Sequence, residues 1–157
     1  MSTFELFEFL SYVVTVIGFP FAIVVFLLEQ RKQRQNDEEE LHVDLSEDYT
    51  DFLKLVLQHS DLGLLRQSTT TIDLNAEQKE RRFAIFGILI AIFERAYILV
   101  YEEDMGRQQA RLWQSWQDFM VEWCKREDFR AELPRLLEGE DGDFAKHLMA
   151  TVANTKL

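Results

Sequence analysis

Cysteine and recognisable catalytic motifs are scarce in this sequence. The chain has one cysteine, Cys124, and three widely separated histidines. One cysteine cannot form an internal disulfide, and no metal-ligand spacing, phosphate-binding loop or nucleophile motif occurs. Glu38 and His42 stand one helical turn apart, but two ligands on a polar face are more typical of a solvated surface. We therefore predict no catalytic residue, no cofactor and no metal site, and we do not expect an enzyme.

Positive charge is also in short supply. The chain has 17 Lys and Arg against 28 Asp and Glu, and residues 36–157 alone carry 14 against 25. An acidic surface is repelled by phosphate backbones, and the sequence has no basic patch with interleaved aromatic residues. These features argue against a nucleic-acid partner.

Charged residues are absent from the long stretch between Phe9 and Leu28. These 20 residues match the hydrocarbon thickness of a bilayer at about 1.5 Å per residue. The segment before them carries Glu5 and Glu8 instead of the basic start of a signal peptide, and no small-residue cleavage site follows. We predict an uncleaved transmembrane helix that anchors the chain in the lipid bilayer.

The charges beside this stretch predict its orientation. Arg31, Lys32 and Arg34 follow it directly, whereas the leading segment is acidic. Because cytoplasmic flanks carry an excess of Lys and Arg, we expect a single-pass protein with its N-terminus outside and its C-terminal domain in the cytoplasm. The predicted organisation is a transmembrane anchor at 1–30, a charged juxtamembrane stalk at 31–40 and an acidic helical domain at 41–157.

Small residues gather on one face of the predicted transmembrane helix. Their spacing of four, three and four residues favours close helix packing and hence self-association. The same face reaches a glutamate at each end, so it is open to two interpretations. The glutamates either mark the headgroup boundaries of a packing contact, or form a carboxylate ring at each mouth of a cation pore. The face consists of Glu8, Ser11, Thr15, Gly18, Ala22 and Glu29.

Pro20 lies within the same stretch and removes one backbone hydrogen-bond donor. We expect a local kink near the centre of the bilayer at this residue. The kink is open to two interpretations, because proline is well tolerated in membrane helices. It is either a hinge that functions in a conformational change or a passive bend.

The rest of the chain shows helical periodicity. Neither Gly nor Pro occurs in 29–58, and apolar residues recur in its second half every three or four positions. A connection rich in Ser, Thr and Asp follows. Asn75 with Gln78 then resembles a capping box that begins a second helix, which we expect to run to about Glu103 before Gly106 ends it.

Aromatic residues mark a third helix around Trp113–Trp123, and two short helices are expected at 129–137, interrupted by Pro134, and at 143–152. Aromatic residues at helical spacing are more typical of a core than of a ligand site. A ligand site on this aromatic face is the alternative interpretation. The predicted fold class is all-α, with one N-terminal transmembrane helix followed by a cytoplasmic helical bundle.

Residues 83–101 raise a structural ambiguity, because this apolar stretch is also a candidate for a second membrane span. Its uncharged part covers only 83–93, and Glu94 and Arg95 would lie near the middle of the bilayer. Each such charge costs roughly 2.5 to 3.5 kcal/mol there. We therefore favour a central core helix that neighbouring helices cover.

Four segments carry a resemblance to a known group of proteins. They are HSDLGLL at 59–65, FAIFGILIAIFERAYILVYEE at 83–103, RLWQSWQDFMVEW at 111–123 and DFR at 128–130. With the N-terminal span and its basic exit, the chain resembles a family of short bacterial membrane-anchored helical proteins of unknown function. The resemblance implies a bacterial inner-membrane protein with a cytoplasmic helical domain, and it supplies no activity.

Two functions are compatible with these features. The first is a non-enzymatic, homo-oligomeric membrane scaffold or regulatory protein whose cytoplasmic domain binds other copies or an unknown protein partner. The alternative is a small oligomeric ion channel in which the transmembrane helix lines a cation pore. We favour the scaffold, because the face of small residues predicts helix packing first.

Overall fold

Every regular element is a helix in the computed structural model, which describes residues 3–66 and 73–155. Side chains are described at 20–30, 32–33, 43–66 and 73–155. The all-α prediction is confirmed for these residues, while the transmembrane location of the first helix stays a prediction. The elements are α1 (Thr3–Gln58), the 3-10 turn η1 (Ser60–Leu62), α2 (Ala76–Val100), α3 (Arg107–Cys124), α4 (Glu127–Leu136) and α5 (Gly142–Asn154).

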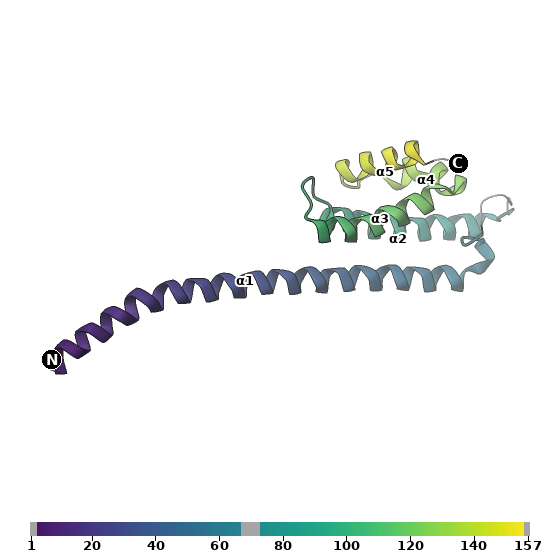
Figure 1. Cartoon of the computed structure of the whole chain (residues 1–157). Coiled ribbons are helices and arrows are strands. Elements are labelled where there is room, and N and C mark those ends of the chain that lie inside the picture. Colours follow the sequence, from purple (N-terminus) through teal and green to yellow (C-terminus); the bar gives the residue numbers. More distant parts are fainter. Residues whose placement is uncertain (1–2, 67–72, 156–157) are drawn as a thin grey trace. The chain divides into compact units, whose positions relative to one another are not determined.

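The chain divides into two compact units, Met1–Val43 and Asp44–Leu157. The first unit is the larger part of α1, and the whole uncharged stretch 9–28 lies within this helix. Pro20 is inside α1, and Figure 1 shows the helix bending in its purple, N-terminal part. A bend is what a proline inside a helix causes, because its ring clashes with the preceding turn. Whether the bend moves in function stays a prediction.

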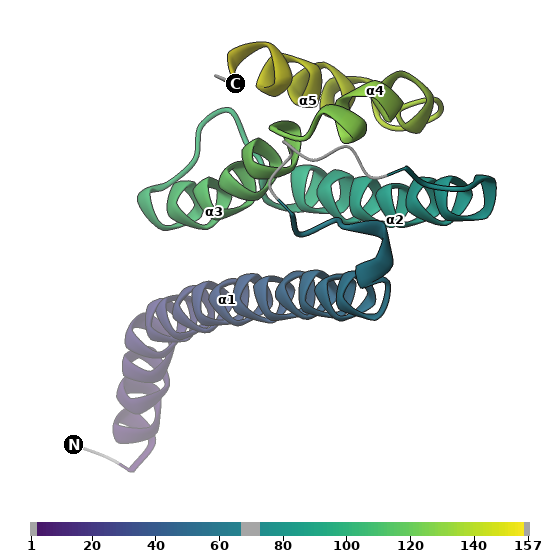
Figure 2. The same ribbon diagram turned by 90° about the vertical axis from the view of Figure 1, so that its right-hand side faces the viewer.

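The second unit is a layered bundle of short helices. Its part of α1 begins at Asp44 and buries Leu45, Phe52 and Val56, which repeat at helical spacing along one face. Figures 1 and 2 both show α2 and α3 between this part of α1 and the pair α4 and α5. This part of α1 therefore packs its apolar face on the bundle, as the periodicity predicts.

α2 is the central helix of the bundle and packs against α3, α4 and α5. It begins with the predicted capping box: the Asn75 side chain accepts a hydrogen bond from the backbone N–H of Gln78, and the Gln78 side chain accepts one from the N–H of Asn75. The predicted end at Glu103 is wrong. The helix stops at Val100, three residues before Glu103, and Gly106 is the N-cap of α3.

The buried face of α2 forms the centre of the hydrophobic core. Among the described residues α2 is the one helix long and apolar enough to cross a membrane, and the core helix of a soluble protein can have the same length and composition. Its packing against three other helices supports the core interpretation. The face runs almost the full length of the helix, and its buried residues are Ile85, Phe86, Leu89, Ile90, Ile92, Phe93, Ala96 and Val100.

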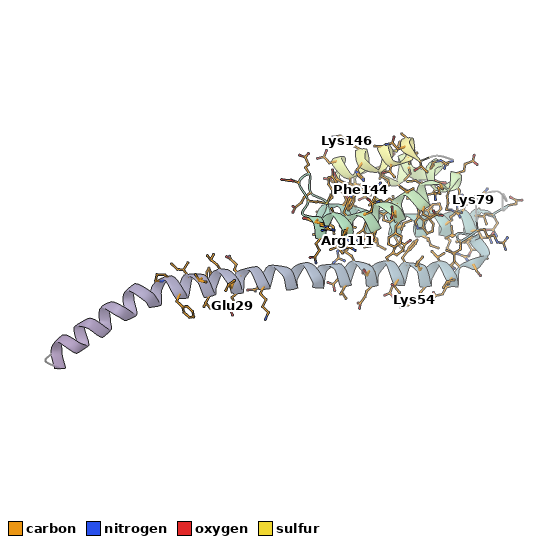
Figure 3. All side chains as sticks on the ribbon, in the orientation of Figure 1. Glu29, Lys54, Lys79, Arg111, Phe144 and Lys146 are labelled. Carbon is orange, nitrogen blue, oxygen red and sulfur yellow. The ribbon has the colours of Figure 1, made fainter. Side chains whose placement is uncertain are left out.

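α3, α4 and α5 close the core around α2. α3 buries Trp113, Trp116, Met120 and Trp123, as its aromatic spacing predicts. Pro134 does not interrupt α4 but lies within its last turn, and the helix ends at Leu136. Figure 3 shows Phe144 between the ribbon of α5 and the layer beneath it, and this ring is fully buried.

Tight turns connect the last helices. Gly139 has φ +93°, a backbone conformation that residues with a side chain rarely adopt, and this allows the chain to reverse after α4. The Asp141 side chain then accepts hydrogen bonds from the backbone N–H groups of Asp143 and Phe144 and caps α5.

Candidate functional site

The predicted packing or pore face lies on the first unit of the chain. Glu8, Ser11, Thr15 and Gly18 lie outside the residues whose exposure the structure describes. Ala22 and Glu29 are both exposed and seven residues apart, which places them on one face of α1. Pro20 is also exposed.

A fully exposed apolar segment is the most distinctive feature of this unit. Every residue from Pro20 to Gln30 is exposed, including Phe21 at 67% and Phe26 at 64%. Figure 3 shows side chains radiating from both sides of the ribbon around Glu29. Contiguous apolar surface of this kind marks a site that contacts a membrane or another protein, because water disfavours its exposure by about 25 cal/mol per Å².

The aromatic residues of the second unit pack mainly on each other. The Tyr49 ring stacks on Phe119 with centroids 4.3 Å apart and meets Trp116 edge-on at 6.0 Å. The Trp123 indole N–H donates to the Tyr49 hydroxyl at 3.1 Å, and burial raises the pKa of this tyrosine. This arrangement joins α1 to α3 and supports the interpretation that the aromatic stripe is core.

A half-buried ion-pair network holds the connection after α1 against α4. Arg126 contacts Asp128 at 2.8 Å and donates to the backbone carbonyls of Leu64 and Arg66 at 2.7 and 3.0 Å. Arg82 of α2 contacts the same Asp128 carboxylate at 3.2 Å. One carboxylate therefore orients two guanidinium groups, and one of these satisfies carbonyls of a segment without regular structure. Sequence patterns alone do not reveal this network, because Arg82 and the carbonyls of Leu64 and Arg66 are distant along the chain from Arg126 and Asp128.

A shallow polar groove lies between α3 and α5. Its volume is about 440 Å³, and Gln117 and His147 face each other across it with Oε1 and Nε2 2.6 Å apart. Gln117 also donates to the Thr151 hydroxyl at 3.0 Å. Burial lowers the pKa of His147, because the charged form loses its hydration. Gln117, His147 and Thr151 therefore satisfy one another's hydrogen-bonding groups. These bonds connect α3 to α5 and do not form a catalytic pair.

A second hollow of about 370 Å³ lies beside the aromatic residues of α1 and α3. Tyr49, Trp123 and Leu64 contribute to its walls, and Lys125 and Arg126 bring positive charge. Arg126 is already paired with Asp128, and Lys125 is paired with Glu122. The hollow therefore has few polar groups free to orient a ligand.

The titratable groups of the bundle do not form a recognisable active site. Burial raises the pKa of the Cys124 thiol to about 12, so this sulfur stays protonated and unreactive at neutral pH. A hydrogen bond to Glu94 raises the pKa of Glu140, and Glu94 also accepts from the Asp141 backbone N–H at 2.6 Å. Within the described residues, no group of three or more His, Cys, Asp or Glu is placed to hold a metal ion.

No protein-family model, no curated protein and no solved structure matches this chain. The resemblance to short membrane-anchored proteins therefore stays a prediction.

Proposed function

We propose that this protein is a non-enzymatic, homo-oligomeric membrane scaffold or regulatory protein with a cytoplasmic interaction domain. The observation that carries the proposal is the apolar segment of α1, where every residue from Pro20 to Gln30 is exposed. A helix that is apolar all round is stable in a membrane or inside a larger assembly, and its exposed backbone groups are already satisfied by the helix itself.

The position of this segment supports a bilayer as its environment. The uncharged stretch 9–28 lies entirely within α1 and has the length of a membrane span. Arg31, Lys32 and Arg34 follow it, which favours a cytoplasmic position for the second unit. The resemblance implies that the membrane is a bacterial inner membrane. A domain that buries its aromatic residues and carries excess negative charge is suited to the aqueous side.

Self-association through the small-residue face gives the scaffold its oligomeric form. Ala22 and Glu29 share the exposed face of α1 that continues the spacing of the small residues. Membrane helices associate where small side chains let the backbones approach closely, because lipid offers no hydrophobic drive. The partners implied are the lipid bilayer, other copies of the chain and a protein that binds the cytoplasmic domain.

Two variants of α1 test the oligomer. In Ala22→Leu a larger side chain enters the packing face and keeps the helix backbones apart, and we expect self-association to weaken by about fivefold, which corresponds to about 1 kcal/mol. Val24→Leu adds a similar side chain to an exposed position on the opposite face and serves as the control. The measurement is the mass of the full chain in nanodiscs over a dilution series. Equal masses for both variants and the wild type would remove this face as the interface.

The anchor itself is tested by membrane fractionation. We expect the full chain to stay in the membrane fraction after washing with alkaline carbonate, which releases peripheral proteins. Release into the wash would contradict the anchor and leave the exposed segment as a protein-binding surface. A reagent that modifies lysine but does not cross membranes should leave Lys79 unmodified in intact cells and modify it after lysis.

A further inference from the structure

The face of α2 that points away from the core carries a stripe of apolar residues, with Glu80 at its beginning and Arg95 just before its last member, Ile98. Its members follow each other at intervals of four, four, three, four and three residues, which keeps them in line along the helix. Every member is exposed, and Ile88 and Ile98 are large apolar residues exposed at 45% and 58%. The stripe consists of Glu80, Ala84, Ile88, Ala91, Arg95 and Ile98.

We propose that this stripe of α2 pairs with the same stripe of a second copy of the chain, antiparallel about a two-fold axis near Ile88. In this register the midpoint of the contact lies between Gly87 and Ile88. Ala84 then lies opposite Ala91 of the second copy, and Ile88 lies beside its own counterpart. A two-fold contact uses one patch on both subunits, so the patch must be complementary to itself.

Charge complementarity selects this register. It places Glu80 opposite Arg95 of the second copy, and the two-fold axis repeats the pair at the other end. Glu80 is exposed and has no ion pair with the described residues of its own chain. Arg95 contacts Asp48 at 2.7 Å and is 49% exposed, so its planar guanidinium retains free donors for a second carboxylate. Each end of the contact therefore brings a carboxylate to a cation.

Side-chain size favours the same pairing. Two alanines that face each other let the helices approach to the short end of the usual interaxial range of about 8–10 Å. The two Ile88 side chains then fill the centre of the contact, where water is excluded first. The exposed surface of Ala84, Ile88 and Ala91 is thereby buried in both copies.

The ion pair on the stripe argues against a lipid surface as its occupant. Arg95 lies between Ala91 and Ile98 in the line of the stripe and is bonded to Asp48 of α1. A charged pair at this position would enter the hydrocarbon of a bilayer together with the isoleucines, at a cost of a few kcal/mol for each charge. A second copy instead brings Glu80 to the same place.

A cross-linking experiment on the full chain in detergent tests the pairing. The only native cysteine, Cys124, is fully buried, and its thiol has its pKa raised to about 12, so the wild type should give almost no cross-link with a short bifunctional maleimide. Ile88→Cys places a thiol next to the two-fold axis, and we expect covalent dimer. Met149→Cys on α5 is the matched control, because Met149 is 46% exposed but lies off the stripe.

Charge reversal then tests the register. In the Ile88→Cys background, Glu80→Arg should reduce the yield of dimer at least about fivefold, since two cross-subunit pairs become repulsive. Adding Arg95→Glu recreates both cross-subunit pairs and should restore part of the yield, because the same change also places a carboxylate beside Asp48 of α1. Glu138→Arg, which makes the same charge change at an exposed residue outside the stripe, should leave the yield unchanged.

Two results would overturn the pairing: an Ile88→Cys dimer yield no higher than that of Met149→Cys, or equal losses from Glu80→Arg and Glu138→Arg. If the thiol introduced by Ile88→Cys is protected from a water-soluble monomaleimide in nanodiscs, without dimer, the stripe is instead assigned to lipid. The pairing does not depend on the contact made by α1. Repeating the cross-link in Ala22→Leu separates the two, because that variant disturbs only the α1 face.

Discussion

The apolar segment of α1 and the central helix α2 both contain long apolar runs, but the two runs have different surroundings. Residues 20–30 of α1 are exposed on every side, whereas 44% of the most apolar stretch of α2 is buried against other helices. Phe26 is 64% exposed, and Phe86 is fully buried. High hydropathy therefore predicts that a segment avoids water. Whether other helices of the same chain bury the segment depends on the residues that pack against it.

The largest expected difference between the two regions is in core packing. Phe86→Ala removes a fully buried ring and should lower the free energy of unfolding of the Asp44–Leu157 unit by about 3–5 kcal/mol. Phe26→Ala removes the same atoms from an exposed position and should leave that unfolding unchanged. Urea denaturation of the full chain, followed by tryptophan fluorescence from α3, measures both. Similar losses of unfolding free energy in the two variants would contradict the difference between the two regions.

An effect of intermediate size on the free energy of unfolding is expected from the Arg126–Asp128 network. Asp128→Ala leaves Arg82 and Arg126 without their half-buried carboxylate, and we expect a loss of about 1–3 kcal/mol in the free energy of unfolding. Asp51→Ala breaks an exposed pair with Lys54 and should have no measurable effect. The same urea titration reports both variants. An equal response would mean that burial does not set the value of these ion pairs.

The smallest expected effect is a pH dependence confined to the packed region. Burial lowers the pKa of His147 below its usual 6.5, so the folded state binds this proton less readily than the unfolded chain does. The stability that neutral His147 contributes to the folded state is present above pH about 6.5, and it is lost as the pH falls through the pKa that His147 has in the folded protein. Wild type should therefore lose more stability than His147→Gln between pH 7.5 and 5.5. Parallel melting curves for the two proteins would contradict this prediction.

Local signals in the sequence predicted much of the helical organisation. The capping box at Asn75 and Gln78 and the aromatic spacing of α3 are interactions within a few residues, so they can be read without the fold. The end of α2 was predicted three residues too late, because the sequence offered no stop signal before Gly106. Pro134 was expected to interrupt its helix, yet a proline near the last turn removes only one bond.

The candidate contacts between distant residues could not be predicted in the same way. The carboxylate of Asp128 meets Arg82 from 46 positions earlier, and Arg95 meets Asp48 across 47 positions. The polar link of Gln117 to His147 spans 30 positions. Such pairs depend on how helices cross, and a periodic pattern on one helix does not specify its neighbour.

From the sequence it follows that the protein is helical, that residues 36–157 are acidic and that the first long apolar stretch carries no charge. These properties follow from local spacing and composition, which act within one or two helical turns. The sequence pattern does not specify which side of α2 is core and which side is exposed, and the folded arrangement of the helices does. That choice depends on the packing of α3, α4 and α5, because a helix that is apolar nearly all round has no preferred face until its neighbours cover one.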